Sequence, residues 1–231
     1  MNKTGKETVR VHMLETLLFF FPKMAFKHHT LLALREFVKP DEVKRIWNKT
    51  LEHQKTLASK RPQYSFGTNY LIHYMEWDCA LYRSLQEEGV SESSAKELIE
   101  KINWSVFGSN IAVMFRVSQL RSRNLMARIE WMVDLMFLLV FSAPFQRRKI
   151  HSPNEVAFDI LVCPLAKYFK DQGVAELTSA AACSLDHHMA GLWGVILSRS
   201  QTIAQGHPIC DFRFHTNLPK KETGIQTPRS R

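Results

Sequence analysis

The sequence predicts an α+β protein, with a helical N-terminal layer packed on a small C-terminal antiparallel sheet that contains a β-hairpin. Two observations carry this prediction. Apolar residues recur at helical spacing through most of residues 9–142. A polar, proline-containing linker at 144–153 follows, and after it apolar residues alternate between turn signals, as in strands. We therefore expect a helical region over 1–150, an α+β region over 151–216 and a basic, flexible tail over 217–231, with the first two packed as one compact unit.

Each expected helix has a local reason. Asp41, which follows Pro40, is a natural N-cap, and Ser91 with the Ser94/Glu97 pair gives a second start signal. The helical patterns end at Gly89 and at Pro144. The expected helices cover residues 9–21, 31–38, 41–51, 68–86, 91–121 and 124–142.

In the C-terminal region, Glu155–Pro164 alternates apolar residues and ends at a proline, which predicts a strand. A short helix is expected at Leu165–Asp171 and an alanine-rich helix at Glu176–Trp193. The last stretch, Gly194–His215, predicts a β-hairpin that turns at residues 205–207.

Composition excludes several classes of protein. The formal charge is +9, but the basic residues are scattered and no basic motif with interleaved aromatics occurs, so nucleic-acid binding is not expected. The apolar runs Met13–Phe21 and Leu135–Ala143 are too short to span a bilayer, and the N-terminus lacks a signal-peptide pattern. Four cysteines without paired spacing argue against a disulfide framework. We expect a cytoplasmic protein, and the sequence leaves open whether it forms a homo-oligomer.

The stretch CSLDHHMAGLW, residues 183–193, concentrates reactive side chains. On a helix Cys183, Asp186 and His187 share one face, while His188 points about 100° away. Three interpretations stay open: a metal site, a nucleophilic thiol with His187 as its base, and cysteines that are small buried hydrophobes. Cys-x-x-Asp-His is not a standard zinc spacing, so no metal or other cofactor is predicted.

The expected hairpin adds further polar candidates. Cys210 shares one strand face with two phenylalanines, while Asp211 and Arg213 lie on the other. Arg199 is one of few charges among apolar residues of the first strand, so it either pairs with an acid or receives an anionic substrate. For Arg199 and for Arg213, the alternative to substrate binding is an ion pair with Asp211 or Asp186.

The segments CPLAKYFKDQG and CSLDHHMAGLWGVILSRSQTIAQGHPICDFRF, within Cys163–Phe214, resemble the C-terminal signature of the L-2-amino-thiazoline-4-carboxylic acid hydrolase family. The pattern is a Cys-Pro with an aromatic residue, then Cys-x-x-Asp on a helix, then Thr-x-x-x-Gly leading to Cys-Asp-Phe-Arg-Phe. The matching residues are Cys163, Pro164, Tyr168, Cys183, Asp186, Thr202, Gly206, Cys210, Asp211, Phe212, Arg213 and Phe214.

The resemblance implies hydrolysis of a cyclic amidine. Water attacks the carbon between nitrogen and sulfur and the ring opens to an N-carbamoyl cysteine, a reaction grouped with hydrolysis of non-peptide carbon–nitrogen bonds. Cys183 is then the expected nucleophile, Asp186 the carboxylate that holds the protonated nitrogen and His187 the acid/base.

The same resemblance defines the expected substrate and its alternatives. The substrate would be a small carboxylate-bearing or aromatic molecule, and a tailoring step in secondary metabolism would fit. The expected substrate-binding residues are Arg199, Thr202, Arg213, Cys163, Tyr168, Cys210 and His188. Two other functions remain: a lyase, isomerase or cyclase of the same fold, in which the thiol is dispensable, and a small-molecule-binding module without catalysis.

Overall fold

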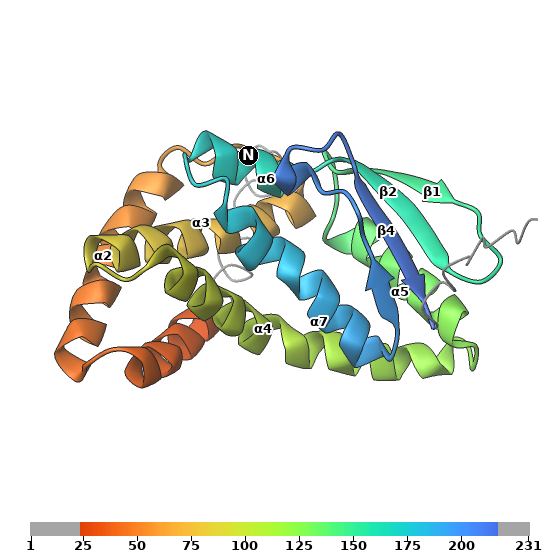
Figure 1. Cartoon of the computed structure of the whole chain (residues 1–231), viewed down its shortest axis with the longest axis horizontal. Coiled ribbons are helices and arrows are strands. Elements are labelled where there is room, and N and C mark those ends of the chain that lie inside the picture. Colours follow the sequence, from red (N-terminus) through yellow and green to blue (C-terminus); the bar gives the residue numbers. More distant parts are fainter. Residues whose placement is uncertain (1–23, 217–231) are drawn as a thin grey trace, which may run out of the picture.

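The computed structural model describes residues 24–216, and within them the first half of the chain is helical (Figure 1). The expected helix at 9–21 and the tail at 217–231 lie outside the described residues. The helices of this half span residues 24–37, α2 Pro40–Ala58, α3 Phe66–Glu87, α4 Glu92–Val117 and α5 Leu125–Leu139.

Of the predicted helix start signals, the one at Ser91 is confirmed. The Ser91 side chain accepts a hydrogen bond from the backbone N–H of Ser94 at 3.2 Å and so caps α4. Asn124 caps α5 in the same way through the N–H of Ala127, at 3.0 Å. The N-cap predicted at Asp41 is wrong: Lys39 occupies the N-cap position of α2, and Asp41 lies inside the first turn. Pro40 suits the first helical position because the N–H it lacks would have no intrahelical partner there.

The C-terminal half forms a four-stranded antiparallel sheet in the order β1-β2-β4-β3. Its strands are β1 Gln146–Ile150, β2 Val156–Val162, β3 Ile196–Ser198 and β4 Cys210–His215. Strand β1 is a correction, because its residues were expected to be a polar linker. An edge strand tolerates such residues, since one side of its backbone faces away from the sheet. Here Arg147 and Lys149 both pair with Asp134 of α5.

The predicted C-terminal hairpin is present but is wider than expected. Strands β3 and β4 pair antiparallel, with Leu197 opposite Phe214. Between them, residues 199–209 form a loop that contains a 3₁₀ turn at Ile203–Gln205. This turn ends at Gly206, whose φ is 90°. Arg199 therefore lies just beyond β3 and not within a strand.

A segment of helices joins β2 to β3, which lie on either side of β4 in the sheet. It contains α6 Pro164–Asp171, a π-helix at Ser179–Cys183 and α7 Ser184–Trp193. The two predicted helices in this segment are confirmed. The sequence did not predict the π-helical turn at the start of the second.

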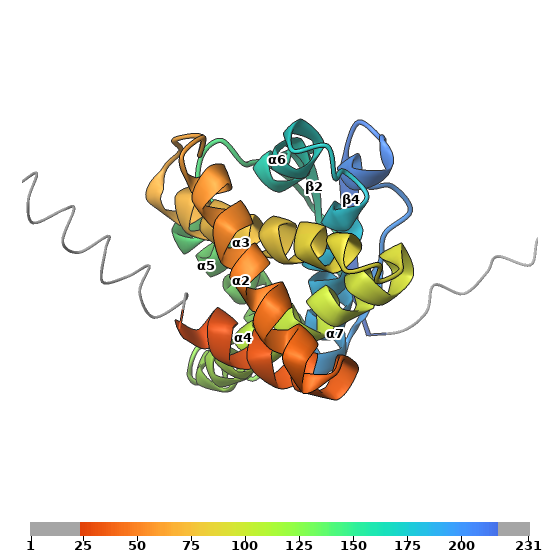
Figure 2. The ribbon, with the colours of Figure 1, turned by 90° about the vertical axis from the view of Figure 1, so that its left-hand side faces the viewer.

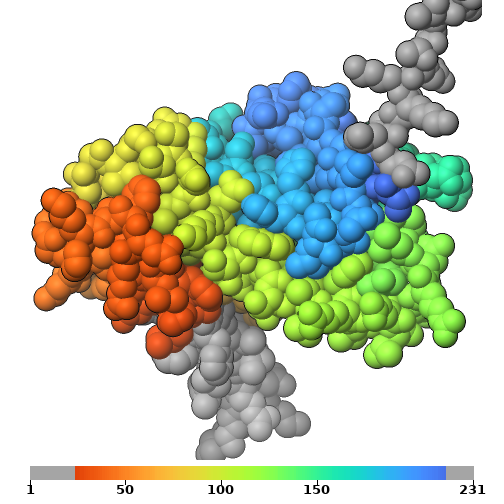
Figure 3. Space-filling model, turned by 60° about the horizontal axis from the view of Figure 1, so that its bottom comes forward, coloured from red at the N-terminus to blue at the C-terminus, as the bar shows by residue number. Residues whose placement is uncertain are grey.

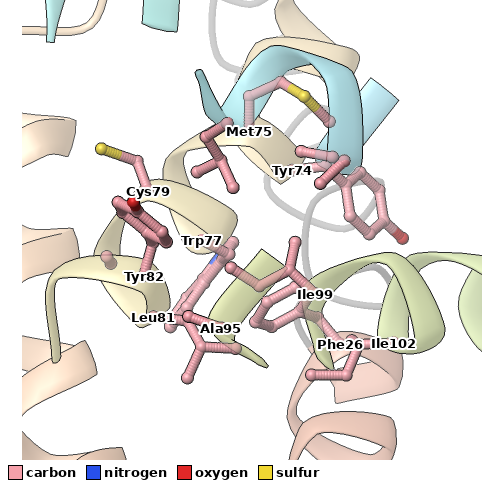
Figure 4. Close-up of a cluster of buried hydrophobic side chains, with 14 of the residues drawn as sticks. Phe26, Tyr74, Met75, Trp77, Cys79, Leu81, Tyr82, Ala95, Ile99 and Ile102 are labelled. Atoms are coloured by element: carbon pink, nitrogen blue, oxygen red, sulfur yellow. The ribbon is translucent and has the colours of Figure 1, made fainter. Parts of the chain in front are cut away.

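Buried apolar residues form two clusters, one in the helical half and one beneath the sheet. The first gathers around α3, where Trp77 packs with Phe26, Leu81 and Ile99 (Figure 4). The second joins Met132 of α5 and Trp193 of α7 to the phenylalanines of β2 and β4.

Helix α4 contributes to both clusters, through Ile102 in the first and Phe115 at the edge of the second. It runs from the helical end to the sheet (Figures 1 and 3), while the view from the helical side shows α2 and α3 crossing each other (Figure 2). This arrangement places α7 against α4 on one side and against the sheet on the other.

Within residues 24–216, no helix combines the length and the apolar character that crossing a bilayer requires.

Candidate active site

The predicted reactive stretch begins at Cys183, the last residue of the π-helical turn. It continues into α7, whose first turn contains Asp186. In the wider π-helical turn, the Ala180 carbonyl accepts a hydrogen bond from the Ser184 hydroxyl at 2.8 Å. The Ala181 carbonyl accepts one from a side chain of α4 at 3.0 Å. Single π-helical turns are rare and are often found at functional sites.

Arg199 reaches this turn from the loop after β3. Its Nη1 donates to Asp186 Oδ2 at 2.6 Å, and its Nη2 donates to the Cys183 carbonyl at 3.1 Å. The guanidinium also lies over the ring of Phe212, 5.0 Å from its centroid. Only 6% of the Arg199 side chain and 21% of the Asp186 side chain are exposed. The ion pair expected as an alternative to substrate binding is therefore formed.

Cys163 and Cys210 come to the same place from the ends of adjacent strands. Cys163 follows β2 and caps α6, where its sulfur accepts the N–H of Ala166 at 3.5 Å. Cys210 begins β4, and its sulfur accepts the N–H of Ile203 at 3.2 Å. Cys163 and Cys210 both act on the pKa of the Cys183 thiol, as Asp186 and Arg199 also do. The three thiols and the ion pair thus form one cluster.

Burial holds the thiols of this cluster in their protonated form. It raises the pKa of Cys163 to about 11, and it also raises the pKa of Cys210. For Cys183, burial and the nearby Asp186 carboxylate raise the pKa far above its usual range, and Arg199 offsets only part of the effect. A thiolate is therefore costly in the free protein.

Asp186 is the group of the cluster that titrates nearest to neutral pH. Burial raises its pKa to about 6, although Arg199 opposes the shift. A carboxyl group with that pKa exchanges protons readily near pH 7, which suits a general acid or base.

The two histidines do not join the cluster. His187 is exposed, and in residues 24–216 it forms no hydrogen bond with Cys183 or Asp186. Burial and the nearby Arg199 lower its pKa. His188 bonds Glu100 of α4 at 2.7 Å and stacks on Trp104. The shared helix face predicted for Cys183 and His187 therefore does not produce a contacting pair.

Thr202 and Arg213 of the signature make structural contacts outside the cluster. Thr202 caps the 3₁₀ turn by accepting the N–H of Gln205 at 3.2 Å. Arg213 bonds the Phe158 carbonyl and pairs with Asp159 at 3.0 Å, so its partner is neither of the acids considered from the sequence.

Tyr168 is buried away from the cluster, against the helical half. Its hydroxyl has no hydrogen-bond partner in the described residues, and burial, with a smaller effect of the nearby Glu76 carboxylate, raises its pKa.

The structure also shows buried polar residues that the sequence analysis did not single out. Asp78 of α3 and Asn103 of α4 are fully buried and share a hydrogen bond of 2.9 Å. Glu76, also fully buried, is paired with Arg61. A sequence signal existed, because both acids interrupt an otherwise apolar helical run at residues 74–81.

A cavity of about 500 Å³ lies at the other end of the sheet, between α5 and the β1–β2 connection. Its lining includes Asp134, Arg147, Lys149 and Phe158, and none of the residues of the cysteine cluster. At about 3.3 Å per strand residue, Phe158 and Cys163 are roughly 16 Å apart. Across residues 24–216, no group of three or more His, Cys, Asp or Glu side chains is arranged to hold a metal ion.

Comparison with known proteins identifies the family of the chain. No curated protein and no solved structure matches the chain. The family model described as L-2-amino-thiazoline-4-carboxylic acid hydrolase matches residues 79–214, which extends the likeness upstream of Cys163–Phe214 into α3, α4 and α5. The match covers more than half of the chain and all five residues of the cluster. The chain therefore belongs to the L-2-amino-thiazoline-4-carboxylic acid hydrolase family.

Proposed function

We propose that the protein hydrolyses a cyclic amidine that carries a carboxylate, and that the reaction takes place at the cluster of Asp186, Arg199 and Cys183. The observation that carries the proposal is the buried Asp186–Arg199 pair beside a cysteine, within the segment that the family shares. A guanidinium suits a substrate carboxylate, and a carboxylate suits a protonated amidine.

Substrate binding would exchange the partners of this pair. Arg199 uses one N–H on Asp186 and one on the Cys183 carbonyl, so other N–H groups remain for a substrate carboxylate. As the substrate carboxylate takes over part of Arg199, Asp186 is freed to hold the amidinium nitrogen and to accept a proton.

The chemical step then needs one proton acceptor that becomes a donor. Asp186 takes a proton from water while the water oxygen bonds to the amidinium carbon, which gives a neutral tetrahedral intermediate. When the ring substrate is a thiazoline, the bond from this carbon to sulfur breaks and sulfur takes the proton from Asp186. The hydroxyl proton of the intermediate passes to solvent as the carbonyl forms, and the products are an N-carbamoyl group and a free thiol.

A covalent route through Cys183 remains the second version of the same function. There the thiol attacks the amidinium carbon and gives its proton to Asp186. The ring carbon–sulfur bond then breaks and the ring sulfur takes that proton, which leaves the amidinium carbon bound to Cys183. Water then attacks this carbon, and the Cys183 thiol leaves with one proton while a second passes to solvent and the carbamoyl product forms. The raised pKa of Cys183 and the exposed position of His187 favour the route through water.

The test is turnover of 2-amino-thiazoline-4-carboxylate, followed by free thiol and by a product heavier by one water. Asp186→Asn should lower turnover by on the order of a hundredfold or more. Cys183→Ala separates the two routes, because it abolishes only the covalent one. The matched control is Cys79→Ala, a buried cysteine of α3 outside the cluster. Full activity in a folded Asp186→Asn variant would reject the proposal.

A second candidate function is small-molecule binding without turnover, favoured by the cavity of about 500 Å³ between α5 and the β1–β2 connection. Pockets of this size commonly hold small ligands. This function predicts saturable binding of the thiazoline without thiol release. The binding would be unaffected by Asp186→Asn and weakened by Arg147→Met on the cavity wall.

A further inference from the structure

Asp78 and Asn103 form a buried polar contact between α3 and α4. The Asn103 amide Nδ2 donates to Asp78 Oδ2 at 2.9 Å, and both side chains are fully buried. The remaining oxygens, Asp78 Oδ1 and Asn103 Oδ1, have no hydrogen-bond partner in the described part of the chain. Both are acceptors when Asp78 is ionised, so neither can then satisfy the other.

One proton on Asp78 would resolve this shortage. A protonated carboxyl group gains an O–H donor, which can bond the Asn103 carbonyl oxygen and complete a two-bond acid–amide pair. An ionised Asp78 would instead be a buried charge, and in residues 24–216 no basic side chain pairs with it. Burial raises the pKa of Asp78 well above its usual value, in agreement with this contact.

The other amide hydrogen of Asn103 connects this pair to the candidate active site. Nδ2 also donates to the Ala181 carbonyl at 3.0 Å, in the middle of the π-helical turn. Two residues later, the Cys183 carbonyl is held by Arg199. The turn is thus fixed from α4 on one side and from the β3–β4 loop on the other.

We propose that Asp78 is a neutral acid that donates its proton to Asn103, and that this pair is a positioning device for the π-helical turn and so for Cys183 and Asp186. The part that concerns catalysis rests on the function proposed above. The protonation of Asp78 and the positioning of Cys183 are independent of that function. In the free protein, Asn103 donates both amide hydrogens, one to Asp78 and one to Ala181, and accepts the proton of Asp78.

The protonation state can be read directly by infrared spectroscopy. A difference spectrum of wild type minus Asp78→Asn at neutral pH, with and without ¹³C-labelled aspartate, should contain a carboxylic-acid C=O band that shifts with the label. A carboxylate band alone would overturn the proposal. Asp78→Asn should fold normally, because its amide supplies the donor that the proton supplies in wild type.

The positioning can be read from the thiol of Cys183 without any turnover assay. Alkylation of each cysteine, followed by peptide mass spectrometry, should show Cys183 labelled about tenfold faster in Asn103→Ala, the factor that corresponds to one net buried hydrogen bond. Asp78→Asn should label like wild type, and so should Asn110→Ala, an exposed position of the same helix. Asn103→Ser, a smaller truncation, serves if Asn103→Ala does not fold. Unchanged labelling of Cys183 in the folded variant would refute the positioning.

The kinetic consequence separates this inference from the proposed function. If thiazoline is turned over, Asn103→Ala should lower kcat by on the order of tenfold to a hundredfold with little change in KM, since a small misplacement of reacting groups has that cost. Asp78→Asn should keep the wild-type kcat, because its amide still donates to Asn103. If thiazoline is not turned over, the infrared and labelling results still decide whether the pair acts as proposed.

Discussion

Replacing Arg199 by Met removes the cation of the candidate site while keeping most of the side chain's apolar volume. The change leaves the Asp186 carboxylate without its partner at 2.6 Å and the Cys183 carbonyl without its donor at 3.1 Å. Removing one partner of a buried ion pair typically costs about 3–5 kcal/mol. Because 21% of the Asp186 side chain is exposed, we expect the lower end, about 3 kcal/mol. For a chain of this size that corresponds to a fall in Tm of roughly 6–12 °C.

A double-mutant cycle tests whether the cost comes from the pair. In the Arg199→Met, Asp186→Asn double variant no charge is left unpaired, so its free energy of unfolding should exceed the additive expectation by at least about 1.5 kcal/mol. The assay is urea unfolding of the four proteins at pH 7. The matched control is Arg148→Met, because Arg148 also lies 2.6 Å from an aspartate but is 62% exposed, and its loss should cost less than about 1 kcal/mol. Additivity of Arg199 and Asp186 within about 0.5 kcal/mol would refute the reasoning.

Three further outcomes are expected. The folded-state pKa of Asp186 is raised to about 6, so its stabilising contribution is complete below pH 4 and is lost as pH rises to about 6. Over that window the free energy of unfolding of wild type should fall by about 3 kcal/mol relative to that of Asp186→Asn, measured by urea unfolding at each pH. His187→Ala should change turnover less than threefold, on the order of a surface substitution, because this side chain is exposed and outside the cluster; a hundredfold loss in steady-state assays would restore it as the acid/base. Arg213→Met should destabilise the fold by about 2 kcal/mol by leaving buried Asp159 with Arg148 alone, and thermal melts with unchanged KM would separate this from a role in substrate binding.

The fold class could be predicted because local chemistry decides most of it. Ser91 and Asn124 cap helices at the positions where the sequence predicts helices to begin. The strand predicted over 155–164 forms as β2, although residues 157–160 are all buried and the burial does not alternate as the sequence pattern suggested. Strand β1 was missed because its residues are mostly charged; they form a strand by pairing with β2, and Arg147 and Lys149 also pair with Asp134 of α5. Such a tertiary partner leaves no local pattern.

The candidate site was predictable in its members more than in its contacts. The signature contains Cys163, Cys183, Asp186 and Cys210, and Arg199 was singled out separately as a charge among apolar residues; the structure groups all five. Helical spacing alone paired Cys183 with His187. It could not show that Arg199, which lies in a loop, is the residue that contacts Cys183.

The roles of Asp78 and Asn103 were also beyond the sequence. Their partnership depends on how α3 packs against α4 and on a π-helical turn that a periodicity of 3.6 residues does not reveal.

The pairing of β2 with β4 also determines when the cluster can exist during folding. Ile160 and Cys210 are neighbours across the sheet although they are fifty positions apart in the chain. Closing a loop of that length has an entropic cost of about 3–4 kcal/mol. This cost comes before the contacts between β2 and β4 can form and offset it. A ribosome-bound or partly unfolded chain that lacks β4 therefore has Cys163 and Cys183 without the burial that keeps them protonated. Such a chain exposes to oxidants the thiols that the finished fold keeps unreactive.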